Sequence, residues 1–159
     1  MTKQNTNEIF LIKESIRDNT TTNNGITKTI TTINHENVLS AIDSKFIDNM
    51  QYTLYEWMPT TLLRFVETNP ALLNRAFALY ILNSLISAYT FLSGVCNGQM
   101  FDIVNDNIRA GRNASGKICI KVYPPQLTCN SVSQRKTVYN NDIKHLGQVL
   151  FQIFKNRQR

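Results

Sequence analysis

The sequence is poor in cysteine, with three in 159 residues. Cys96, Cys119 and Cys129 lack the spacing of metal ligands, and their odd number leaves one unpaired in any disulfide scheme. The first residues also lack the pattern of a secretory signal peptide. These absences argue against a disulfide-stabilised secreted protein. We therefore expect an intracellular protein, cytoplasmic or nuclear.

Clustered positive charge is scarce as well. The formal net charge is +6, but the lysines and arginines are scattered. Lys155, Arg157 and Arg159 form one small group, in and beside a basic tail at 156–159. A nucleic-acid groove would gather basic and aromatic side chains on one surface. We expect no nucleic-acid partner.

No charged residue occurs between positions 76 and 96, a stretch long enough to cross a bilayer. Polar residues recur within it, among them Asn83, Ser84 and Ser87, and Gly94 interrupts it near its end. Such groups suit a helix packed inside a protein better than one that faces lipid. We expect no membrane partner, and a membrane anchor at 76–96 stays an alternative.

The spacing of apolar residues predicts an α+β domain. We expect strands at residues 9–12, 38–42, 51–57 and 118–122, and helices at residues 26–33, 61–66, 71–92 and 142–154. A turn around Asp48 and Asn49 should join the second and third strands. Thr60 or Thr61 should cap the second helix.

Asp102 and Asn107 lie five positions apart, directly after the long apolar helix. This spacing resembles the catalytic loop of protein kinases, H-R-D-L-x-x-x-x-N, although Met100 and Phe101 replace the His and Arg. Further segments resemble kinase motifs in the family's order. Residues 30–38 contain an H-x-N-[IV] turn at His35, residues 52–58 resemble the strand that leads into the hinge, and residues 61–66 resemble the helix after the hinge. Residues 116–121 resemble the strand before D-F-G, and residues 139–150, which include Asp142, resemble the central large-lobe helix.

The resemblance implies a partial protein kinase-like fold. A disordered N-terminus at 1–8 would precede a partial small lobe at 9–58, with a few antiparallel strands and one helix. A truncated, mainly helical large lobe would follow at 59–155. Lys13, Glu56, Met58 and Asn107 would then mark vestigial nucleotide and metal positions.

Departures from the kinase pattern argue against catalysis. The D-F-G position falls on Val122, Tyr123 and Pro124, and a valine cannot ligate magnesium because a hard cation needs oxygen donors. No glycine-rich loop precedes residue 9, and no A-P-E occurs before Asp142. We interpret Asp102 as part of a degenerate catalytic loop with a structural role.

We therefore expect a pseudokinase that binds a protein partner and needs no cofactor or metal. The resemblance suggests an active kinase as that partner. This chain would block it by mimicry, as virus-encoded truncated kinase domains are thought to block their targets. Asp142 and His35 would have structural roles. The alternative is a divergent phosphotransferase that uses Asp102 and Asn107 with ATP and magnesium.

Overall fold

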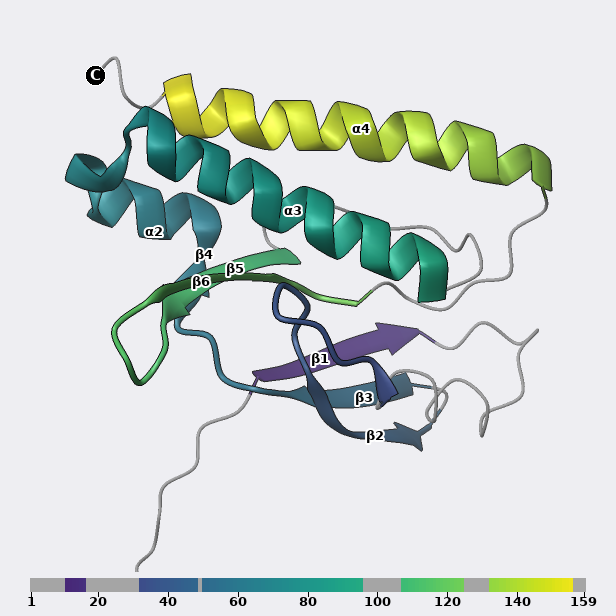
Figure 1. Cartoon of the computed structure of the whole chain (residues 1–159). Coiled ribbons are helices and arrows are strands. Elements are labelled where there is room, and N and C mark those ends of the chain that lie inside the picture. Colours follow the sequence, from purple (N-terminus) through teal and green to yellow (C-terminus); the bar gives the residue numbers. More distant parts are fainter. Residues whose placement is uncertain (1–10, 17–31, 49, 96–106, 125–131, 156–159) are drawn as a thin grey trace, which may run out of the picture.

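The computed structural model in Figure 1 describes residues 11–16, 32–48, 50–95, 107–124 and 132–155. The elements follow in the order β1 (Leu11–Ile16), β2 (Ala41–Ile47), β3 (Met50–Tyr55), β4 (Thr60–Thr61), α2 (Leu62–Thr68), the 3₁₀ helix η1 (Pro70–Leu72), α3 (Arg75–Val95), β5 (Ile108–Arg112), β6 (Ile118–Val122) and α4 (Val132–Lys155). The predicted helix at 26–33 lies almost wholly outside the described residues.

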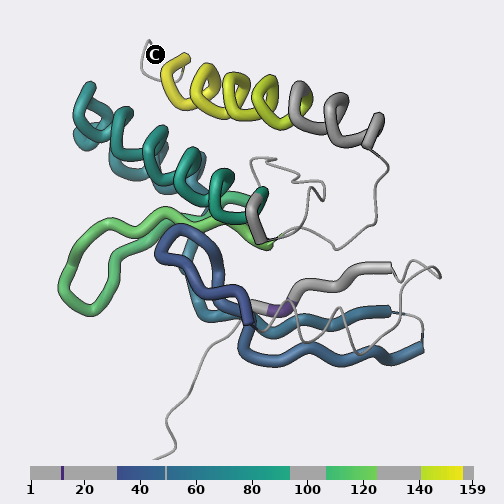
Figure 2. Tube along the Cα trace, turned by 45° about the vertical axis from the view of Figure 1, so that its right-hand side comes forward, coloured from purple at the N-terminus to yellow at the C-terminus, as the bar shows by residue number. Residues whose placement is uncertain are grey.

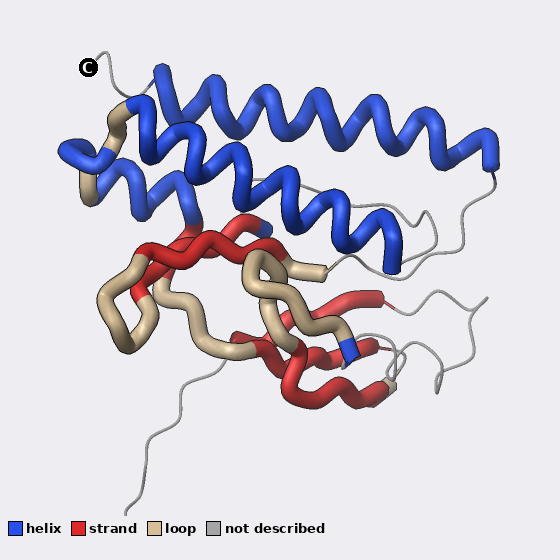
Figure 3. Tube along the Cα trace, in the orientation of Figure 1, coloured by secondary structure: helices blue, strands red, loops and turns tan. Residues whose placement is uncertain are grey.

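The strands form two small antiparallel sheets. The first has the order β1-β3-β2 and the second the order β4-β5-β6. Figures 1 and 3 show the first sheet at one end of the molecule and the helices at the other, with the second sheet between them. The turned view in Figure 2 preserves this order of layers. The second sheet therefore contacts both other parts.

The turn between β2 and β3 falls where the sequence predicts it. Asp48 has a φ of 46°, in the left-handed region that aspartate tolerates better than most residues. Within this hairpin the Ser44 and Thr53 hydroxyls lie 3.0 Å apart, and Gln51 Nε2 donates to Ser44 Oγ at 2.9 Å. All three side chains are buried, so their hydrogen bonds offset the cost of removing polar groups from water.

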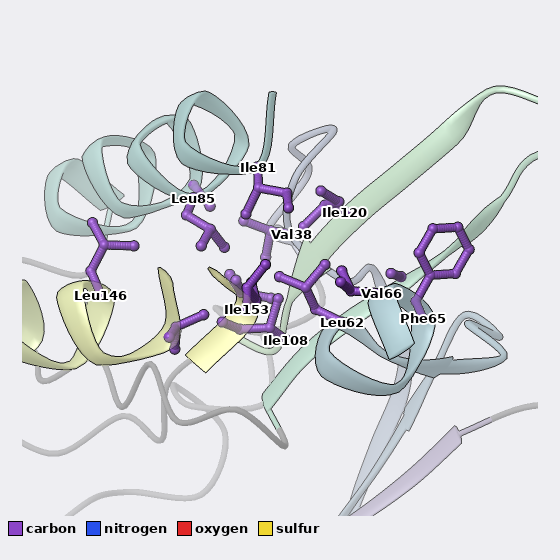
Figure 4. Packing of buried hydrophobic residues seen from close by; sticks show 14 of the residues in the cluster. Val38, Leu62, Phe65, Val66, Ile81, Leu85, Ile108, Ile120, Leu146 and Ile153 are labelled. Carbon is purple, nitrogen blue, oxygen red and sulfur yellow. The ribbon is translucent and has the colours of Figure 1, made fainter. Parts of the chain in front are cut away.

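The main core lies between the helices and the second sheet. Ile81, Leu85, Ala88 and Leu92 are almost fully buried, and they recur along α3 at the spacing of one helical face. Leu146, Val149 and Ile153 do the same on α4. Figure 4 shows side chains from α2, α3, α4 and β5–β6 converging on this region, including Leu62, Ile108 and Ile120.

Side-chain caps define where two of the helices begin. Thr61 precedes α2, and its Oγ1 accepts a hydrogen bond from the Arg64 N–H at 3.3 Å, as the sequence predicts. Asn74 does the same before α3, where its Oδ1 accepts from the Phe77 N–H at 2.9 Å. The caps satisfy amide groups that a helix start leaves without partners.

Other element boundaries differ from the expectation. The predicted strand 38–42 is wrong in its first residues, because Val38 forms an isolated parallel bridge to Val122 and β2 begins only at Ala41. The sequence predicts no strand at Ile108–Arg112, where the structure has β5. Helix α4 begins at Val132, well before the predicted start at 142, because its first turns are polar and carry no apolar periodicity. By contrast, β6 matches its predicted bounds.

By length and composition, α3 could cross a membrane. The window Arg75–Ser93 has a mean hydropathy of 1.4, and 28% of it is buried inside the protein. A core helix of a globular protein passes the same test, so this single helix is weak evidence for a span. The buried face of α3 contacts β6 and α4, and Tyr80 donates its hydroxyl to the Ile118 carbonyl at 2.7 Å.

Two leucines of α3 provide a matched test of this packing. Leu85 is 1% exposed and Leu79 is 49% exposed. Leu85→Ala should lower the free energy of unfolding by about 2–5 kcal/mol, because it leaves a cavity in the core. Leu79→Ala should change it by less than about 0.5 kcal/mol. Urea denaturation measures both values, and equal losses would contradict the packing of α3 described above.

Candidate functional site

The two sheets are joined through the segment just before β2. The Leu39 N–H donates to the Val122 carbonyl at 2.8 Å, and the Val122 N–H donates to the Asn37 carbonyl at 2.9 Å. The Asn37 side chain adds a bond from Nδ2 to the Ile120 carbonyl at 3.0 Å. Asn37, Val38 and Leu39 are all buried. This segment therefore holds the end of β6 against the start of the first sheet.

Glu56, which directly follows β3, is held by both sheets. Its Oε1 accepts from the Ser40 N–H at 2.8 Å and from Lys121 Nζ at 2.6 Å. Its own N–H donates to the Ser40 carbonyl at 3.0 Å. The Lys121 and Glu56 side chains are 17% and 32% exposed, so the ion pair is only partly screened by water. A charged side chain of β6 is thus tied to the end of β3.

A second positively charged side chain, that of Arg109, bonds to the carbonyl of Met58. Arg109 Nη2 donates to the Met58 carbonyl at 2.8 Å, which joins β5 to the segment between β3 and β4. Gly111 lies directly beside this segment, and a Cβ atom on it would come within 2.7 Å of Pro59 Cδ. Only glycine permits so close an approach without a shift. We call Glu56, Met58, Arg109, Lys121 and Tyr123 the inter-sheet junction.

Two tyrosines pack at this junction. The rings of Tyr55 and Tyr123 meet edge to face with centroids 5.0 Å apart. Burial raises the pKa of the Tyr55 phenol well above its usual range. Burial also raises the pKa of Tyr123, and the nearby Arg109 guanidinium offsets part of that rise. Both phenols are therefore neutral at physiological pH, and neither acts as a base there.

Val122 is the residue that the resemblance places at the metal-binding aspartate of kinases. It is 6% exposed and belongs to the main apolar core, with Val38, Ile108 and Ile120. Its N–H and carbonyl are both used in the bonds to the segment before β2. The position therefore offers a cation no side-chain oxygen, and its surroundings favour an apolar group.

Two other predicted nucleotide and metal positions, Asn107 and Lys13, lie within the described residues. Asn107 directly precedes β5, and its carbonyl accepts from the Tyr123 N–H at 3.0 Å. Lys13 lies on β1 opposite Thr53 of β3. Asp102 lies outside the described residues. Among the residues that the structure describes, no three His, Cys, Asp or Glu side chains gather closely enough to hold a metal ion.

The two residues with predicted structural roles both lie in packed surroundings. Asp142, on α4, is 3% exposed. The His35 ring stacks on Phe91 of α3 at 4.6 Å, and its Nδ1 accepts from the Asn37 N–H at 3.1 Å. Its Nε2 lies 3.3 Å from Ser87 Oγ. His35 therefore links α3 to the segment that joins the two sheets.

Sequence reasoning missed the residues that close the junction. The sequence predicts no strand or helix at Arg109, and it places Lys121 only within the alternating strand 118–122. A useful signal is available, because side chains alternate between the two faces of a strand. Lys121, between the buried Ile120 and Val122, points to the opposite face, where a lysine needs a partner or solvent.

Comparisons with solved structures agree with this arrangement. The kinase domain of PknI from Mycobacterium tuberculosis is 13% identical, with a TM-score of 0.59 over 84% of this chain. A cysteine-to-alanine mutant of that domain is 12% identical, with the same TM-score. Rad53 1-466 in complex with AMP-PNP is 16% identical, with a TM-score of 0.63 over 80% of this chain.

The chain has a partial protein kinase-like fold. It spans 56% of the PknI kinase domain and 36% of the Rad53 chain. No protein-family model and no curated protein matches the sequence. At such low identities the likeness to the kinases establishes the fold and nothing about activity. Function has therefore to be inferred from the side chains of the junction.

A double-mutant cycle tests the closure of the junction. Glu56→Gln and Lys121→Met, alone and combined, should give a coupling energy of about 1–2 kcal/mol, since the pair is largely desolvated. Asp43 and Lys45 provide the control, because their contact of 3.7 Å joins side chains that are 55% and 73% exposed. Their coupling should stay below about 0.5 kcal/mol. Chemical denaturation measures both cycles, and equal couplings would contradict a junction-specific ion pair.

Proposed function

We propose that this chain is a catalytically inactive kinase-like domain that acts by binding another protein. The observation that carries the proposal is Val122, a buried apolar residue at the position where the resemblance puts the aspartate that binds the bridging magnesium. Phosphoryl transfer depends on charge neutralisation around ATP, so the loss of that ligand removes a central part of the chemistry.

The contacts of the junction support the same conclusion. The resemblance assigns adenine recognition to residues 56–58. Here the Glu56 carboxylate is engaged by Lys121 and Ser40, and the Met58 carbonyl accepts from Arg109. A nucleotide base would have to compete with contacts that the chain already makes. Because Lys121 and Arg109 are charged donors, their bonds are stronger than neutral ones.

The surface of the described residues supports a binding role. Several large apolar side chains are about half exposed or more, namely Ile12, Ile42, Ile47, Leu79, Ile143 and Phe151. Ile143 and Phe151 share one side of α4, and exposed apolar side chains gathered in this way mark protein interfaces. The kinase-like fold makes an active kinase the partner class that we propose, because a domain of similar shape can occupy a contact made by another kinase lobe.

Nucleotide binding is tested by thermal denaturation with magnesium and millimolar ATP. We expect a change in Tm of less than about 1 °C, because a ligand that does not bind the folded state cannot stabilise it. A rise of several degrees would favour the divergent phosphotransferase. Phosphate transfer from radiolabelled ATP should likewise be absent, and Asp102→Asn should leave the signal unchanged. Transfer that Asp102→Asn abolishes would overturn the proposal of inactivity.

The partner class is tested by affinity capture from cells and mass spectrometry. We expect protein kinases to be enriched over a control capture with an unrelated protein as bait. Candidates should then be confirmed by purified binding and by a lower rate of substrate phosphorylation. Enrichment of unrelated proteins alone would contradict kinase mimicry while leaving catalytic inactivity in place.

A further inference from the structure

Helix α4 has one face in the core and the opposite face exposed. Leu146, Val149 and Ile153 point into the packed interior, where Figure 4 labels Leu146 and Ile153. We call the opposite side the α4 outer face, formed by Ile143, Lys144, Gly147, Phe151, Phe154 and Lys155. In Figures 1 and 3, α4 is the outermost helix, and no described element covers its far side.

This face is apolar at its centre. Phe151 is 67% exposed, Ile143 is 47% exposed and Phe154 is 37% exposed. Together they make one apolar stripe, because positions 143, 147, 151 and 154 share one side of a helix. Such an exposed apolar stripe, on a helix whose opposite face packs in the core, indicates a surface that a partner covers.

An open groove of about 530 Å³ runs along the same side of α4. It is lined by Lys144, Gly147, Gln148, Phe151, Gln152 and Lys155. Gly147 leaves its floor bare, and a Cβ atom placed there would meet nothing within 4 Å. The groove extends along about three helical turns, or roughly 16 Å. These dimensions suit a short helix bound lengthwise, with one apolar side chain above Gly147.

The charge of the outer face is of one sign. Lys144 and Lys155 lie at the two ends of the groove, on either side of Phe151. The only acidic residue in the sequence of α4 is Asp142, which is 3% exposed and lies on the core side. A ligand that is apolar along one stripe and acidic near its two ends therefore complements the face in both properties.

A second copy of this chain is a poor occupant. Antiparallel pairing of two outer faces about their centre brings Lys144 of one copy near Lys155 of the other, and parallel pairing opposes identical lysines. Either arrangement places like charges together beside the apolar stripe.

We propose that the α4 outer face binds an acidic amphipathic helix of another protein. The inference rests on the proposed binding function and names the surface and the chemistry of its partner. Phe151 supplies the central apolar contact, the bare backbone at Gly147 admits a partner side chain, and the two lysines pair with acidic groups near the two ends of the bound helix.

The test uses a synthetic helical peptide with leucines at i, i+3, i+4 and i+7 and glutamates near both of its ends. Fluorescence anisotropy against the full chain should give saturable binding that weakens as salt is added. Phe151→Gln, Gly147→Gln and the double change Lys144→Glu/Lys155→Glu should each weaken binding by about tenfold or more, since central contacts dominate such interfaces. Circular dichroism checks that each variant is folded.

Matched controls separate the outer face from general stickiness. Ile86→Gln changes a side chain on α3 that is 45% exposed, a fraction close to that of Ile143, and should leave the affinity unchanged. A scrambled peptide of the same composition should not bind. Absence of binding by the ordered peptide, or equal loss in Ile86→Gln and Phe151→Gln, overturns the proposal.

Two further measurements assign the occupant. We expect no chain to sediment with phosphatidylserine vesicles. Sedimentation that requires Phe151, together with no binding of the peptide, would show that the outer face binds a membrane surface and not a helix. Sedimentation velocity should show a monomer, and a dimer lost in Phe151→Gln would replace it with a second copy. ATP turnover would overturn the proposed inactivity whatever the peptide does, so the two proposals fail separately.

Discussion

The two short backbone bonds between Val122 and the Asn37–Leu39 segment are the interaction on which the rest of the architecture depends. The first sheet is small, and an isolated sheet of this size has a limited core of its own. These bonds dock it onto β6, which is packed in turn against α3. They also fix Val122 inside the apolar core, where a carboxylate would lose its hydration. The same contact thus joins the sheets and fixes the apolar surroundings of Val122.

The same connection determines how the inter-sheet junction is used. With β6 held in place, Lys121 reaches Glu56 and the adjacent β5 directs Arg109 to the Met58 carbonyl. These polar groups bond within the chain, which supports the proposal that binding takes place elsewhere on the surface. The exposed apolar side chains and the basic outer face of α4 are the places where we propose it.

The sequence predicts the fold well where local patterns and packing agree. Ile118–Val122 alternates cleanly and became β6, and Thr61 before an apolar run became the cap of α2. The α+β class follows from such segments, and the kinase-like fold follows from the resemblance of the motifs in their order. Prediction failed where tertiary contacts decide. The short strand β4 and strand β5, with Arg109 and Gly111, exist because they pair with each other and with β6.

The candidate site was harder to predict than the fold. That Val122 offers no oxygen to a cation can be read directly from the sequence, because a valine side chain holds only carbon and hydrogen. The partners of Lys121 and Arg109 cannot, since they come from residues far along the chain. A crystal grown with magnesium and AMP-PNP tests the central claim most directly. We predict no nucleotide at residues 56–58, with the Arg109–Met58 and Lys121–Glu56 contacts intact. A base bonded to that segment, with Arg109 displaced, would contradict the account.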